Sequence, residues 1–193
     1  MTKRSIQTPP LVWLRVKAFE NHACAPNVTN PAAMRRRNRE ETEARMVEAF
    51  GRVLEREGIQ KIGVNKVVRE AGVGKELIYR YFNGLAGLAK AWGETEKFWP
   101  TIDELAGGRT VEAFRQLPPQ IRLQTIFENY IAAIRKRPVT QEVLAAEIMQ
   151  SNPLIKALGT VREKRRLEVN VLFDDTTDEG RETRIAVAML LVA

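Results

Sequence analysis

The fold of this chain is decided by residues 64–82, which read VNKVVREAGVGKELIYRYF. Apolar residues recur there with helical spacing on both sides of Gly72. Two helices that cross steeply over a turn of three or four residues need a residue in that turn that tolerates a positive φ, and glycine does so without a steric cost. The stretch therefore predicts a helix-turn-helix, with helices over 64–71 and 75–82.

The apolar spacing also indicates which residues form the core of this motif. The inward-facing residues are expected to be Val67, Ala71, Val73, Ile78 and Phe82, with Gly72 at the turn. An amphipathic pattern that begins at Glu40 and stops at Gly58 predicts a preceding helix as the third side of this core. Held in this way, the helix over 75–82 offers its N-terminal turns to the DNA major groove.

The outer face of the helix over 75–82 carries side chains that suit DNA. Lys75 and Arg80 can reach phosphates or guanine edges, the Tyr79 hydroxyl can bond a phosphate, and the Glu76 carboxylate can accept from cytosine N4. The basic run over 35–39 is either an arm along the DNA or a solvated tail. The residues expected to contact DNA are Arg37, Asn65, Lys75, Glu76, Leu77, Tyr79 and Arg80.

The distribution of charge supports a polyanionic partner at one end of the chain. Residues 1–33 hold four basic and one acidic residue, and residues 34–82 hold twelve basic and eight acidic ones. Residues 83–193 hold fifteen of each, so the whole net charge of +7 lies in the first 82 residues. Such an asymmetry is typical of proteins that meet nucleic acid with one part only.

The rest of the chain predicts an all-α fold, since no strand alternation is present. We expect a disordered arm over 1–33, a helix-turn-helix DNA-binding domain over 34–84, and a helical-bundle domain for ligand binding and dimerisation over 85–193. Helices in the last part are expected over 85–99, 110–115, 119–136, 138–153 and 153–173. Met34 is a candidate translation start, and the uncapped apolar stretch 184–193 suggests a chain cut inside a helix.

The motif over 64–82 resembles that of the TetR family of bacterial transcriptional regulators. The resemblance rests on A-G-V at 71–73, a three-residue spacer and L-I-Y-R-Y-F at 77–82, and it covers about residues 40–90. It implies a homodimer that binds a double-stranded DNA operator through the N-terminal domain. It also implies a small-molecule effector in the C-terminal domain and, most often, repression.

Five positions depart from the usual pattern of that family. Gly63 stands where Ser or Thr usually caps the second helix, and Gly74 stands where a Ser usually opens the recognition helix. Glu76-Leu77 replaces a small pair, and Leu85 replaces a basic residue. The alternatives are therefore a degenerate member that no longer binds DNA or a helical protein-interaction module.

Other kinds of site have weaker support. The aromatic residues Trp92, Trp99, Phe127 and Tyr130 are candidates for lining an apolar ligand pocket, although each is also a normal core residue. His22 and Cys24 are too few for a metal site, and no catalytic constellation or phosphate-binding glycine loop occurs, so we expect no enzyme activity, metal or cofactor. One cysteine and no membrane-spanning stretch fit a cytoplasmic protein.

Overall fold

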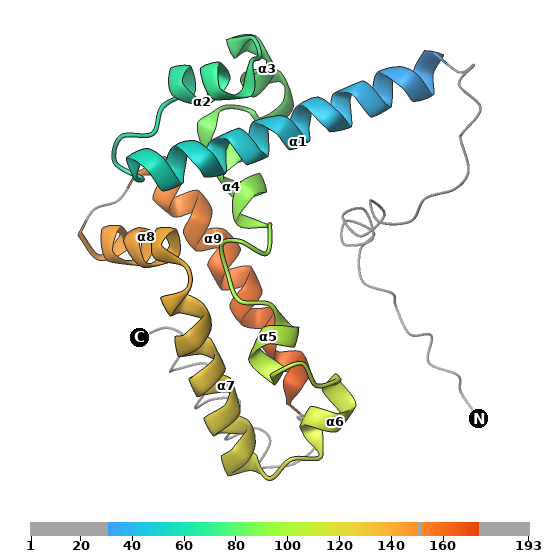
Figure 1. Cartoon of the computed structure of the whole chain (residues 1–193), viewed down its shortest axis with the longest axis vertical. Coiled ribbons are helices and arrows are strands. Elements are labelled where there is room, and N and C mark those ends of the chain that lie inside the picture. The colour runs from blue at the N-terminus through green and yellow to red at the C-terminus, as the bar shows by residue number, and fades with distance from the viewer. Residues whose placement is uncertain (1–30, 150–151, 174–193) are drawn as a thin grey trace. The chain divides into compact units, whose positions relative to one another are not determined.

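The computed structural model describes residues 31–149 and 152–173 (Figure 1). Within these ranges the chain is helical and contains no strand, so the prediction of an all-α fold is confirmed. The helices are α1 (Pro31–Glu57), α2 (Val64–Ala71), α3 (Lys75–Phe82), α4 (Leu85–Gly93), α5 (Ile102–Ala106), α6 (Val111–Arg115), α7 (Pro119–Arg135), α8 (Pro138–Met149) and α9 (Pro153–Glu168), followed by a 3₁₀ turn, η3 (Val169–Leu172).

The first helix is longer than the apolar pattern indicated. It begins at Pro31 rather than at Glu40, so the expected arm over 1–33 is wrong for its last three residues. The added turns carry exposed, good helix formers such as Ala, Met and Arg, which extend a helix without an apolar stripe. Packing divides the chain between Asn38 and Arg39, and the packing described below concerns residues from Arg39 onward.

One core joins the helix-turn-helix to the helices that follow it. On α1 the fully buried residues have helical spacing and are Met46, Ala49, Phe50, Val53 and Leu54. The same cluster takes in Ile78 of α3, Leu88 of α4, Val143 of α8 and Leu158 of α9. Since this core runs across residues 84 and 85 without a break, the domain boundary expected there remains a prediction.

The helix expected over 85–99 is wrong in its second half. α4 ends at Gly93, where the hydroxyl of Thr95 donates to the carbonyl of Trp92 at 2.7 Å. The sequence analysis missed α5, which starts with a capping box in which Thr101 and Glu104 bond each other's backbone N–H groups. Pro100 lies between α4 and α5 and cannot continue a helix, because it lacks the backbone N–H group.

The segment between α4 and α5 is held through its backbone carbonyls. Arg165 of α9 donates to the carbonyl of Glu94 at 2.7 Å, and Arg137, just after α7, donates to that of Glu96 at 3.1 Å. The buried hydroxyl of Thr140 donates to the carbonyl of Phe98. Because these bonds come from three places in the chain, the position of α4 depends on the helices of the second half.

A second, smaller core lies among α5, α6, α7 and η3. Its buried residues are Leu105, Ala106, Phe114, Ile126, Val169, Leu172 and Phe173. The expected last helix over 184–193 lies outside the described residues. No helix of the described ranges is long and apolar enough to span a membrane.

Candidate nucleic-acid interface

The turn between α2 and α3 has the backbone conformation that the motif requires. Gly72 ends α2 with φ +64° and ψ +41°, in the left-handed region, and a Cβ added there would meet open space. Glycine is therefore favoured by the backbone rather than by crowding. After α3, Asn83 adopts the same left-handed conformation with φ +55°.

The residues expected to face inward do so to different degrees. Val67 and Ile78 are fully buried, and Ala71 is nearly so. Val73 and Phe82 are half-buried and pack against the same core. Ile78 is the one fully buried residue of α3, and Leu77, Tyr81 and Phe82 add half-buried contacts with the same core.

The charged residues of α2 pair with α1. The carboxylate of Glu70 accepts from Arg52 Nε at 2.8 Å and from Arg56 Nη1 at 3.1 Å. Lys66 pairs with Glu57 and also donates to the carbonyl of Lys61 at 2.9 Å. The hydrogen bond from Arg52 holds the pKa of Glu70 below its ordinary value of 4.5. These pairs hold α2 on α1 and use two of the three charges of α2.

The outer face of α3 is open. Lys75, Glu76, Tyr79 and Arg80 are exposed, and about half of the Tyr79 surface is accessible. Within residues 31–149 and 152–173, no ion pair joins any of the three charged residues of α3 to another residue. This is the arrangement expected of a helix whose charges serve an external partner.

The other residues expected to contact DNA lie in three different settings. Asn65 is exposed in the first turn of α2. Leu77 is half-buried and packs against the core, so most of its side chain supports the fold. Arg37 is exposed on α1 but precedes Arg39, where the compact unit with α2 and α3 begins.

Two of the departures from the family pattern are coupled in space. A Cβ added at Gly74 would overlap Oε1 of Glu76, so the Glu76 carboxylate fills the place where a serine side chain would stand. Glu76 lies in the first turn of α3, where the helix dipole favours a negative charge. Sequence spacing alone does not indicate this contact.

The sequence analysis also missed a stack of side chains between α1 and α3. The guanidinium carbons of Arg39 and Arg80 lie 4.9 and 4.8 Å from the centre of the Tyr81 ring. Arg80 Nη2 donates to the Tyr81 hydroxyl at 2.7 Å, and Arg39 Nε pairs with Glu43 at 2.6 Å. Arg39 and Tyr81 are far apart in sequence, and no spacing rule connects them.

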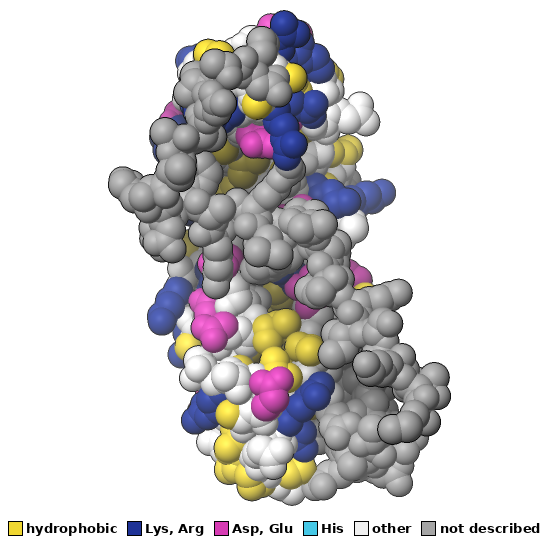
Figure 2. All heavy atoms as spheres, turned by 90° about the vertical axis from the view of Figure 1, so that its right-hand side faces the viewer, with side chains coloured by type: hydrophobic (Ala, Val, Ile, Leu, Met, Phe, Trp, Pro, Cys, Tyr) yellow, Lys and Arg dark blue, Asp and Glu magenta, His cyan; other side chains and the backbone are white. Residues whose placement is uncertain are grey.

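Basic side chains gather at the end of the protein that contains the motif. Figure 2 shows Lys and Arg side chains at the top of its view, the end at which Figure 1 places α2 and α3. Hydrophobic side chains are more frequent lower on the same face.

The aromatic residues expected to line a pocket are only partly brought together. A run of tilted ring contacts joins Phe50, Trp92, Phe98, Trp99 and Tyr130, with ring centres 5.5 to 6.1 Å apart. Phe127 makes none of these ring contacts and is exposed on α7. The aromatic run is mainly part of the core, because the two tryptophans are almost completely buried, although Trp92 also lines the pocket described next.

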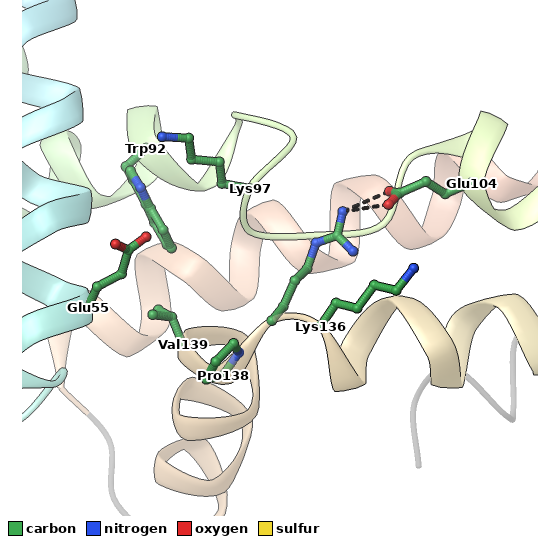
Figure 3. Close-up of a pocket in the computed structure, with 8 residues that line it drawn as sticks. Glu55, Trp92, Lys97, Glu104, Lys136, Pro138 and Val139 are labelled. Atoms are coloured by element: carbon green, nitrogen blue, oxygen red, sulfur yellow. Dashed lines mark hydrogen bonds and ion pairs between the residues drawn. The ribbon is translucent and has the colours of Figure 1, made fainter.

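An open pocket of about 600 Å³ lies beside this aromatic run (Figure 3). It is lined by Glu55, Trp92, Lys97, Glu104, Lys136, Arg137, Pro138 and Val139, so five of its eight lining residues are charged. Arg137 and Glu104 pair at 2.8 Å on one side of it, and Glu55 and Trp92 lie on the other. Of the four aromatic residues expected in a pocket, only Trp92 reaches this one.

Comparison with known proteins identifies the motif. Residues 48–91 match the model of a family described as bacterial regulatory proteins, tetR family, and the predicted resemblance is confirmed. A search of the curated proteins found no match. Among solved structures, the chain is similar to the HlyIIR mutant protein with residues 169–186 substituted by a GSSGSSG linker, at 16% identity and a TM-score of 0.46, over 79% of this chain and 84% of that one.

Proposed function

We propose that this chain, whose residues 48–91 belong to the tetR family of bacterial regulatory proteins, is a transcription regulator that binds DNA through α3. It would act as a homodimeric repressor on a pseudo-palindromic operator, with one α3 in the major groove of each half-site. Half-sites one helical turn of DNA apart would match the two-fold symmetry of such a dimer.

The observation that carries the proposal is the open face of α3. Lys75 and Tyr79 are exposed there, while the charges of α2 are largely used in pairs with α1. The glycine turn sets the two helices in the geometry of a DNA-binding motif. The basic excess of residues 1–82 provides the attraction to a polyanion.

We also propose that the pocket beside Trp92 takes the effector. Its charged lining favours a polar, charged small molecule over the apolar one expected from the aromatic residues. Glu55 reaches this pocket from α1, so an occupant would contact the helix on which α2 rests. A ligand that binds one arrangement of α1 more tightly than another would shift the population that fits DNA.

The test of DNA binding uses the DNA that flanks the gene of this protein, titrated at several salt concentrations. Affinity should fall steeply as salt rises, because each phosphate contact releases counterions. Lys75→Ala and Tyr79→Ala should each weaken binding by about 1–3 kcal/mol. Lys90→Ala, which removes the same charge from the exposed face of α4, is the matched control and should have little effect.

Two outcomes would contradict the proposal. Unchanged affinity in both α3 variants would remove these residues from the interface. Binding that does not depend on salt would favour a protein partner for this surface over DNA.

A further inference from the structure

We propose that Tyr81 is a positioning residue that holds Arg39 and Arg80, from two different helices, as a clamp for one phosphodiester group of the DNA backbone. The inference rests on the proposed function, because it assigns a role in DNA binding to residues outside the expected contact set. Tyr81 is not among the residues that the sequence indicated, and Arg39 was indicated only as the end of the basic run over 35–39.

The Tyr81 ring brings the guanidinium groups of Arg39 and Arg80 to a place where one phosphate could bind both. Both guanidinium carbons lie within 5 Å of one ring centre, so the two positive charges are less than 10 Å apart. The faces of an aromatic ring attract cations, which offsets part of their mutual repulsion. A phosphate that binds both guanidinium groups would offset the remaining repulsion between them. The planar guanidinium group can also form two parallel hydrogen bonds with phosphate oxygens.

The two arginines differ in how they are held. Arg39 also pairs with Glu43, one turn along α1, which fixes its orientation. Arg80 bonds only the Tyr81 hydroxyl among its described polar contacts, through Nη2, so its other N–H groups remain available. Tyr81 is half-buried and packs against the core, so the ring is a fixed support for two exposed side chains.

The position of the stack agrees with the open face of α3. Arg80 follows Tyr79 directly, and both are exposed. Through Tyr81 this face continues onto α1, so the DNA-contacting surface is built from two helices. A phosphate bound by Arg39 and Arg80 would thereby fix α3 relative to α1.

The experiment is a double-mutant cycle on DNA affinity, with the full chain and the DNA that flanks its gene. Arg39→Gln and Tyr81→Leu should each weaken binding about tenfold, since each removes the shared phosphate contact. The double variant should bind about as weakly as either single one. Tyr81→Phe keeps the ring and removes only the acceptor for Arg80, so it should lose about threefold.

Salt dependence and a matched control separate this role from a structural one. The slope of log affinity against log salt should become shallower by about 0.9 in Arg39→Gln and Tyr81→Leu, as expected for one lost phosphate contact. Arg45→Gln removes the same charge from another face of α1 and should change the affinity less. Thermal unfolding of Tyr81→Leu checks that the variant is folded, since leucine retains an apolar contact with the core.

Several outcomes would overturn the inference. Additive losses, about a hundredfold in the double variant, would show that Tyr81 does not act through Arg39. Unchanged affinity in Tyr81→Leu would remove the clamp while leaving the proposed function intact. A wild-type chain that binds no DNA would overturn the proposed function, and this inference with it.

A competition arm distinguishes DNA phosphate from free phosphate. Inorganic phosphate replaces chloride at constant ionic strength, and wild type and Tyr81→Leu are compared. Equal effects on both are expected if the clamp fits the DNA backbone. A loss confined to the wild type would instead assign the stack to free phosphate.

Discussion

The two helices of the motif have similar lengths and charges but opposite surroundings. α2 and α3 each carry three charged residues. On α2, Lys66 and Glu70 pair with residues of α1, whereas in the described part of the chain no charged residue of α3 has an ion pair. Ion pairs therefore fix α2 on α1, whereas the charges of α3 have no such pairs in the described residues.

The two helices also differ in how they are attached to the core. α2 buries Val67 and Ala71, and its ion pairs add a second hold on α1. α3 buries only Ile78. The rest of the attachment of α3 comes from Leu77, Tyr81 and Phe82, which are half-buried and pack against the same core without any ion pair in the described residues.

The largest expected effect comes from removing the anchor of α3. Ile78→Ala should lower the free energy of unfolding by about 2–5 kcal/mol, because the side chain is fully buried and a cavity would remain. Urea unfolding followed by circular dichroism measures it. Lys75→Ala, on the exposed face of the same helix, should stay within about 0.5 kcal/mol of the wild type. A small loss in Ile78→Ala would mean that other contacts hold α3.

A pH titration should separate the paired carboxylate of α2 from the unpaired one of α3. The pKa of Glu70 is lowered in the folded chain, chiefly by the hydrogen bond from Arg52. Its contribution to stability is thus present above its ordinary pKa of 4.5 and is lost as the pH falls through the lowered pKa.

The measurement is the melting temperature against pH for Glu70→Gln and the wild type. The variant should melt lower at neutral pH, and the two curves should converge at acidic pH. Glu76→Gln, on α3, should show a smaller difference, because its carboxylate has no ion pair in the described residues. Curves that stay parallel down to acidic pH would contradict a role for the Glu70 charge.

The smallest expected effects concern the N-caps of the two helices. Gly63 precedes α2 in an extended conformation, and a Cβ added there would meet open space, so Gly63→Ser should stabilise by about 0.3–1 kcal/mol. Gly74→Ser should stabilise less, because the Glu76 carboxylate occupies that space and has to move. Thermal melting of both variants decides this, and a larger gain at Gly74 would show that Glu76 is easily displaced.

Local patterns account for what could be predicted. The helices over 64–71 and 75–82 were predicted with their observed bounds, because apolar spacing and Gly72 act within a few residues. The second half was less accurate. α4 ends early because Glu94 and Thr95 close its last turn although apolar residues continue to Trp99. α5 was missed because it has only five residues and is marked mainly by the capping box of Thr101 and Glu104.

The candidate site was predictable only on one helix. Lys75 and Tyr79 are four residues apart and share a face of α3, as spacing predicts, and both are exposed. The exposure of Phe127 and the half-burial of Leu77 do not follow from spacing, because they depend on which neighbours cover each face.

The amino-acid sequence by itself determined the motif, its resemblance to a known family and the end of the chain that carries the positive charge. These features depend on spacing and composition, which are local and additive. Only the tertiary structure decided which charges are used internally, as in Glu70 with Arg52, and which meet on one ring, as Arg39 and Arg80 do on Tyr81. The physical reason is that ion pairs and ring contacts act over a few ångströms between residues that the chain alone leaves far apart.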